Sequence, residues 1–129
     1  MRSYDVAIAS LAIDAPTKWT DNLISHYRLS GIVSERRGIS RRISHGGLVR
    51  LALVRQLHTG LGLGAGDAVR VAQELLESGG TGVYASGQLR LTIDLPALER
   101  ALDARLAEVL ESAPTPRRGR PPRAATSGS

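Results

Sequence analysis

Near the N-terminus, apolar residues recur three and four positions apart, which is the spacing of amphipathic helices. Residues 3–12 predict a first short helix, with Ile8 and Leu11 on one face. Residues 16–27 predict a second helix, because proline is tolerated in a first turn and Asp14 stands just upstream as a cap. Two short helices joined by a tight turn have the outline of a helix-turn-helix.

From residue 31 the apolar positions alternate, which is the pattern of β-strands. Residues 31–33 and 39–43 predict two short strands, and the polar residues 34–38 between them predict a hairpin tip. Ser44 then predicts the N-cap of a helix whose apolar face continues to His58.

The second half of the chain predicts two more helices around another hairpin. The glycine-rich residues 59–66 predict a break, after which Asp67 caps a helix that ends at Gly79. Residues 82–93 predict a second hairpin, and residues 94–111 predict the last helix, with a stripe of large apolar side chains. This stripe consists of Leu98, Leu102, Leu106 and Val109.

These elements predict a mainly α-helical fold with small β-hairpins, built as a winged helix-turn-helix followed by a C-terminal hairpin and helix. A chain of 129 residues supports one core of ordinary size. The winged part is expected in residues 1–80, and a hairpin and helix that can serve in dimerisation are expected in residues 81–112. Residues 113–129 have no apolar periodicity, which predicts a disordered basic tail.

The net charge of +5 is unevenly distributed along the chain. Residues 35–58 carry six arginines and one glutamate, and residues 114–129 carry four arginines and no acid. Between these two segments, residues 59–113 carry eight acids and four arginines. Two basic segments without opposing acids favour a polyanionic partner, because a charge that serves solubility alone would mix its signs.

Composition argues against several classes of protein. The chain has no cysteine, which rules out disulfides and thiolate metal sites. No segment is long and apolar enough to span a bilayer, and Asp5 and Asp14 interrupt the apolar start. We therefore expect a cytoplasmic, nucleoid-associated protein with no membrane contact.

No motif for catalysis or metal binding stands out. The glycines of residues 60–66 lack the Lys-Ser/Thr pair of a phosphate-binding loop. His26, His45 and His58 lack metal-ligand spacing and carboxylate companions, and no Ser/His/Asp set is placed for catalysis. We therefore expect neither an enzyme nor a cofactor.

Three features resemble the DNA-binding domain of the MerR family of bacterial regulators: the aromatic Tyr4, the Pro-Thr-Lys of residues 16–18 and the Gly-Ile-Ser-Arg-Arg-Ile-Ser of residues 38–44. The last string is similar to the family's wing, and the resemblance extends over residues 4–76. The family usually has a tyrosine beside the arginine pair, where this chain has Ile43, and a long dimerising helix in place of the second hairpin. The resemblance implies a winged helix that binds double-stranded DNA, and it leaves any small-molecule effector undefined.

The resemblance also implies that the second helix enters the major groove. Lys18 suits guanine or phosphate, and Asn22 can pair with adenine through its amide. The alternative is a solvated helix face without a DNA contact. Trp19 shares a stripe with Leu23 and is expected in the core. The polar candidates for DNA contact on this helix are Thr17, Lys18, Thr20, Asn22 and Ser25.

Arginines of the wing are further candidates for DNA contact. Arg36 and Arg37 at the hairpin tip suit phosphates or a minor groove. Arg41 and Arg42 are consecutive in a strand and point to opposite faces, so one of them can face DNA. The other can cover apolar surface with its stem.

The tail has a motif of its own. Arg118 and Arg120 belong to an Arg-Gly-Arg-Pro string that resembles an AT-hook. Such an extended segment is narrow enough to lie in an A·T-rich minor groove, where arginines meet a strong negative potential. A nonspecific basic tail is the alternative.

The sequence therefore predicts a sequence-specific, double-stranded DNA-binding transcriptional regulator. It is expected to form a homodimer through the helix at residues 94–111 and to read an inverted repeat. Two alternatives stay open. One is an architectural, nucleoid-type DNA-binding protein, and the other is an antitoxin or phage accessory protein whose acidic C-terminal helix binds a protein partner.

Overall fold

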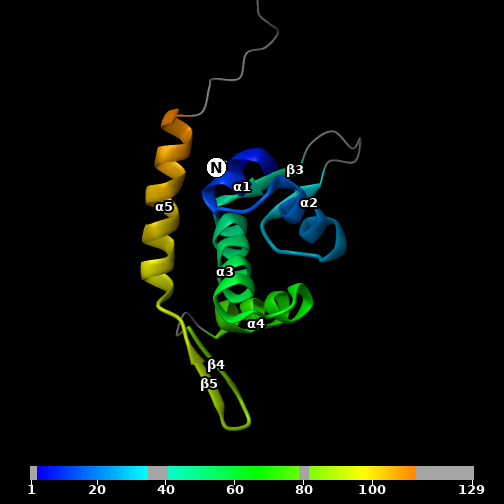
Figure 1. The fold of residues 1–129 in the computed structure, drawn as a ribbon, viewed down its shortest axis with the longest axis vertical. Helices are drawn as coiled ribbons and strands as arrows, with labels where there is room; N and C mark the ends of the chain where they lie inside the picture. The colour runs from blue at the N-terminus through cyan, green and yellow to red at the C-terminus, as the bar shows by residue number, and fades with distance from the viewer. Residues whose placement is uncertain (1–2, 35–40, 79–81, 113–129) are drawn as a thin grey trace, which may run out of the picture.

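The computed structural model of the chain describes residues 3–34, 41–78 and 82–112. The fold is mainly helical with small antiparallel hairpins, as the sequence predicts (Figure 1). No helix in these ranges is both long and apolar enough to cross a bilayer. In chain order the elements are β1 (Ser3–Tyr4), α1 (Val6–Ala12), α2 (Thr17–His26), β2 (Ile32–Ser34), β3 (Arg41–Ser44), α3 (His45–Leu61), α4 (Ala65–Glu77), β4 (Val83–Ser86), β5 (Leu89–Thr92) and α5 (Leu95–Ser112).

A strand, β1, stands where the sequence predicts the start of the first helix. β1 pairs with β3, and Asp5 then caps α1 by accepting a hydrogen bond at Oδ1 from the backbone N–H of Ile8, at 2.8 Å. Ala9 and Ala12 are buried, whereas Leu11 is 52% exposed. The predicted start of this helix is therefore wrong, because pairing with a distant strand removes the first residues from the helix.

α1 and α2 pack together across a turn that contains Asp14, whose φ of +57° lies in the left-handed region. The predicted cap role of Asp14 is wrong, because Pro16 occupies the N-cap position without a side-chain hydrogen bond. Asp14 Oδ1 instead lies 3.5 Å from Arg105 Nη2 of α5. Arg105 Nε also donates to the carbonyl of Leu11 at 2.8 Å, so the C-terminal helix fixes this turn.

β1, β3 and β2 form an antiparallel sheet in this order, and Ile43 of β3 is fully buried. Ser44 joins the sheet to α3, because its Oγ accepts from the N–H of Gly47 at 3.1 Å and donates to the carbonyl of Gly31 at 3.0 Å. Gly31 has a φ of +88°, and a Cβ on Gly47 would lie 2.5 Å from the Gly31 carbonyl oxygen. The predicted cap at Ser44 is confirmed, and both glycines are needed for this close approach.

α3 is longer than the sequence predicts. It continues through residues 59–61 and ends at Leu61, and Gly62 follows as the C-cap with a φ of +75°. α4 begins directly after its N-cap Gly64, so Asp67 lies inside the first turn and is not the cap. The predicted break over residues 59–66 is therefore too long, because packing of α3 against α4 outweighs the low helix propensity of the glycines.

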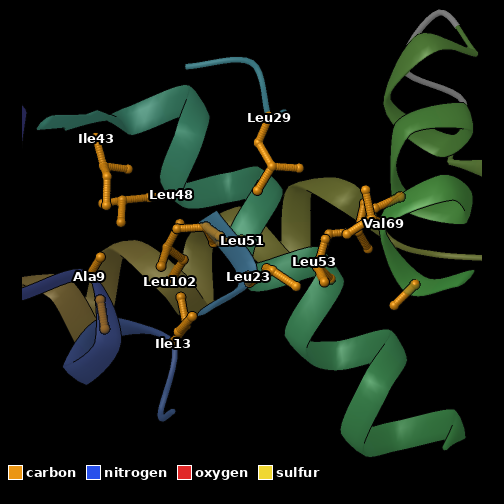
Figure 2. Close-up of a cluster of buried hydrophobic side chains, with 14 of the residues drawn as sticks. Ala9, Ile13, Leu23, Leu29, Ile43, Leu48, Leu51, Leu53, Val69 and Leu102 are labelled. Carbon is orange, nitrogen blue, oxygen red and sulfur yellow. The ribbon is translucent and has the colours of Figure 1, made fainter. Parts of the chain in front are cut away.

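The core is built around α3, which contacts β3, α4 and α5. Leu48, Leu51 and Leu53 of α3 are fully buried, and Leu102 of α5 lies in the same cluster (Figure 2). Leu106 of α5 is also buried. The apolar stripe of α5 thus packs on α1 and α3 of its own chain, and α5 belongs to the same core as the N-terminal elements. The predicted homodimer stays a prediction, but this stripe is not free to form its interface.

β4 and β5 form the second predicted hairpin, which projects from the body of the molecule in Figure 1. Its turn lies at residues 87 and 88, and Gly87 has a φ of +61°. Arg70 of α4 donates to the Oη of Tyr84 at 3.2 Å, and this hydrogen bond raises the pKa of Arg70. Leu89, near the turn, is 65% exposed.

Candidate nucleic-acid interface

α2 has one face in the core and one face in solvent. Leu23 and Ile24 are buried, and Leu23 lies among the core side chains in Figure 2. Packing against α1 holds the backbone of α2, so its outward side chains project from fixed positions. Four of the five polar candidates on this helix are exposed: Thr17, Lys18, Asn22 and Ser25.

Thr20, the fifth candidate, is fully buried, and the prediction that it contacts DNA is wrong. Its Oγ1 donates to the carbonyl of Pro16, one turn back, at 3.4 Å. Thr20 stands three and four positions before Leu23 and Ile24, which places it on the buried stripe. The helical spacing of the apolar residues could therefore have predicted that Thr20 is buried.

Trp19 connects α2 to α3. Its ring stacks on His58 with centroids 5.6 Å apart, and the guanidinium carbon of Arg55 lies 4.8 Å from the Trp19 ring centroid. His58 is fixed in turn, because its Nδ1 donates to the carbonyl of Leu63 at 2.7 Å. Trp19 is half-buried and packs against the core, so the prediction that it lies in the core is confirmed in part.

The exposed face of α2 carries little net charge. Lys18 contributes one positive charge, and Asp21, which is also exposed, contributes one negative charge. In the last turn, His26 Nδ1 donates to the carbonyl of Asn22 at 2.9 Å. This face is therefore better suited to hydrogen bonds with base edges than to charge neutralisation, and attraction to phosphates must come from other segments.

Strand β3 carries a basic side chain, Arg42, near the N-terminal helices. Arg42 is exposed, opposite the buried Ile43, as strand alternation predicts. Its Nε donates to the Oγ of Ser3 at 3.1 Å and its Nη2 donates to the Ser3 carbonyl at 2.9 Å, so the guanidinium is tied to β1. Outside the described residues lie the side chain of Arg41 and the whole of Arg36, Arg37, Arg118 and Arg120.

A cluster that the sequence does not predict lies between α3 and α5. His45 Nε2 donates to Asp103 Oδ1 at 2.6 Å, and His45 Nδ1 lies 3.9 Å from Glu99 Oε2. The expectation that the histidines lack carboxylate companions is therefore wrong for His45. Since 58 positions separate His45 from Asp103, no spacing motif reveals this cluster, and packing of α5 along α3 creates it.

No protein-family model, curated protein or solved structure matches this chain. Function is therefore inferred from the described surface. The two relevant features of this surface are the exposed polar face of α2 and the exposed Arg42 on β3.

Proposed function

We propose that this chain is a sequence-specific, double-stranded DNA-binding transcriptional regulator. In this proposal α2 enters the major groove, and the β2–β3 hairpin lies against the backbone or the minor groove. The observation that carries the proposal is the division of α2 into a buried apolar face and an exposed face of hydrogen-bonding side chains. An α-helix fits the major groove, where amide and ammonium groups can distinguish base pairs.

The surroundings of α2 support the proposal. α1 and α2 are joined by a short turn and followed by a hairpin and a third helix, which is the order of elements in a winged helix-turn-helix. Trp19 and Arg105 fix α2 and the turn before it, so a side chain such as Asn22 keeps a defined position. A side chain that recognises a base edge must be held in a defined position of this kind.

The basic segments at residues 35–58 and 114–129 would supply most of the affinity, because the exposed charges of Lys18 and Asp21 cancel on α2. Binding should then weaken steeply with salt, by a slope of roughly −0.9 in log affinity for each phosphate contact. A homodimer on an inverted repeat is part of the proposal, with an interface other than the buried stripe of α5.

The first test compares two substitutions that each remove one positive charge. Lys18→Ala removes it from the exposed face of α2, and Arg100→Ala removes it from an exposed position on α5. On a duplex selected from random sequence, Lys18→Ala should cost about 1–3 kcal/mol, and Arg100→Ala should have little effect. Fluorescence anisotropy measures both, and equal losses would reject α2 as the interface.

The second test concerns sequence preference. Asn22→Ala keeps the net charge and should relax the preference at one base step, at a cost of about 1–3 kcal/mol on the selected duplex. Gln73→Ala, which removes another exposed amide from α4, is the matched control. If selection yields no motif while binding stays salt-dependent, the architectural role is favoured, because the basic segments would then supply the binding without base readout by α2.

A further inference from the structure

Two carboxylates of α5 converge on the first residue of α3. The donor atoms of His45, Glu99 and Asp103 all lie within 4.8 Å of one another. We propose that these three side chains bind a divalent transition-metal ion of the zinc type, which would bridge α3 and α5. This site does not depend on the proposed DNA binding.

Packing between α3 and α5 holds the backbone of the three proposed ligands in place. Glu99 and Asp103 are four positions apart in one helix, so they share a face and lie one turn apart. Leu102, the neighbour of Asp103, is 4% exposed and anchors this part of α5 in the core. Ser44 caps α3 immediately before His45. All three side chains therefore extend from backbone that is already held in place, as a metal site requires.

The electrostatics of the cluster favour a cation. Two carboxylates one helical turn apart repel each other. In the part of the chain that the structure describes, neither Glu99 nor Asp103 forms an ion pair with an arginine or lysine, and His45 is their basic partner. A dication between them would offset both negative charges, which a neutral imidazole cannot do.

The donor set identifies the class of metal. One imidazole nitrogen with two carboxylate oxygens suits Zn²⁺, whereas Mg²⁺ and Ca²⁺ favour oxygen donors alone. Zinc bonds of about 2.0–2.2 Å place neighbouring donor atoms roughly 3.3 Å apart in a tetrahedron. One donor atom from each of the three side chains already lies within 4.8 Å of the other two, so small side-chain rotations suffice to reach this spacing.

Exposure leaves room for the ion and for water as the remaining ligand. The side chains of His45, Glu99 and Asp103 are 41%, 51% and 53% exposed, so small rotations can bring one oxygen of each carboxylate to the same ring nitrogen. The ion would take the place of the hydrogen that His45 Nε2 donates to Asp103, and the neutral ring would carry its hydrogen on Nδ1 instead.

The test measures Zn²⁺ binding to the full chain by isothermal titration calorimetry in a chelator-free buffer. We expect about one ion per chain with a micromolar dissociation constant, a melting temperature that rises with Zn²⁺ concentration, and no such response to Mg²⁺. His45→Gln and the double substitution Glu99→Gln with Asp103→Asn should each weaken binding by more than about tenfold. Titration with Co²⁺ gives a second readout, since its visible absorption reports the coordination of the ion.

The control variants keep the same residue types elsewhere. His26→Gln removes an exposed histidine of α2, and Glu108→Gln removes an exposed carboxylate of α5, so both should leave Zn²⁺ affinity unchanged. Because the three proposed ligands are partly exposed, circular dichroism should show that their variants stay folded. The proposal is overturned if the full chain binds no Zn²⁺ at millimolar concentration, if binding survives the ligand substitutions, or if His26→Gln weakens it equally.

Discussion

The two hairpins of this protein have strands of three or four residues, but they are attached to the body in different ways. β3 has a strand on each side, β1 and β2, and it buries Ile43 completely. Among the described strands β4 and β5 pair with each other alone, and Leu89 is 65% exposed. The first hairpin is thus continuous with the core, whereas the second is held to α4 at its base, where Arg70 meets Tyr84.

A hairpin in this protein is held in place more by the elements around it than by the hydrogen bonds between its own two strands. A two-stranded hairpin is marginally stable in water unless a third strand or a packed face supports it. The β2–β3 hairpin has both kinds of support, and Ser44 also bonds it to the start of α3. A DNA contact that needs defined geometry is therefore expected from the first hairpin, and the second is expected to tolerate substitution.

The largest effect is expected where the first hairpin meets α3. Gly47→Ala would place a Cβ 2.5 Å from the carbonyl oxygen of Gly31, a backbone atom that cannot rotate away as the end of a flexible side chain can. We expect a loss of about 2–3 kcal/mol in the free energy of unfolding, measured by urea denaturation. Gly46→Ala is the matched control, because its Cβ would meet Ser44 Oγ at an ordinary 3.8 Å. Equal stability of the two variants would contradict the described junction.

An intermediate effect is expected at Ser44. Ser44→Ala removes both the cap of α3 and the hydrogen bond to Gly31, and loss of such a cap costs about 1–2 kcal/mol. Ser86→Ala makes the same change at an exposed position in the second hairpin and should alter stability by less than about 0.5 kcal/mol. Urea denaturation of both variants gives the difference. Similar losses would mean that the two hairpins are equally well attached.

The smallest effect is expected at the turn of the second hairpin. Leu89→Ser changes a side chain that is mostly in solvent, so the free energy of unfolding should change by less than about 0.5 kcal/mol. Ile43→Val, which removes one buried methyl carbon from the first hairpin, should cost about 0.5–1.5 kcal/mol. Thermal denaturation ranks the two variants. A larger loss for Leu89→Ser would show that the second hairpin is packed more firmly than its exposure indicates.

The candidate site was partly predictable from the chain alone. Four of the five polar positions proposed on α2 are exposed, because a helical period separates Lys18 and Asn22 from the apolar stripe of Leu23. The same period places Thr20 on the buried side. The prediction that Thr20 contacts DNA is wrong because it relies on the polarity of the side chain alone. The cluster around His45 could not be predicted, because its carboxylates come from a helix at the other end of the chain.

The sequence by itself determined the features that depend on neighbours within a few residues. These are the helical class, the two hairpins, the cap at Ser44 and the separation of basic and acidic segments, since hydrogen bonds and apolar periods of this kind extend over one or two turns. The tertiary structure decided the pairing of β1 with β3, the covering of the α5 stripe by α1 and α3, and the meeting of His45 with Asp103. Each of these joins residues far apart in the chain, and the choice among such partners depends on how the whole core packs.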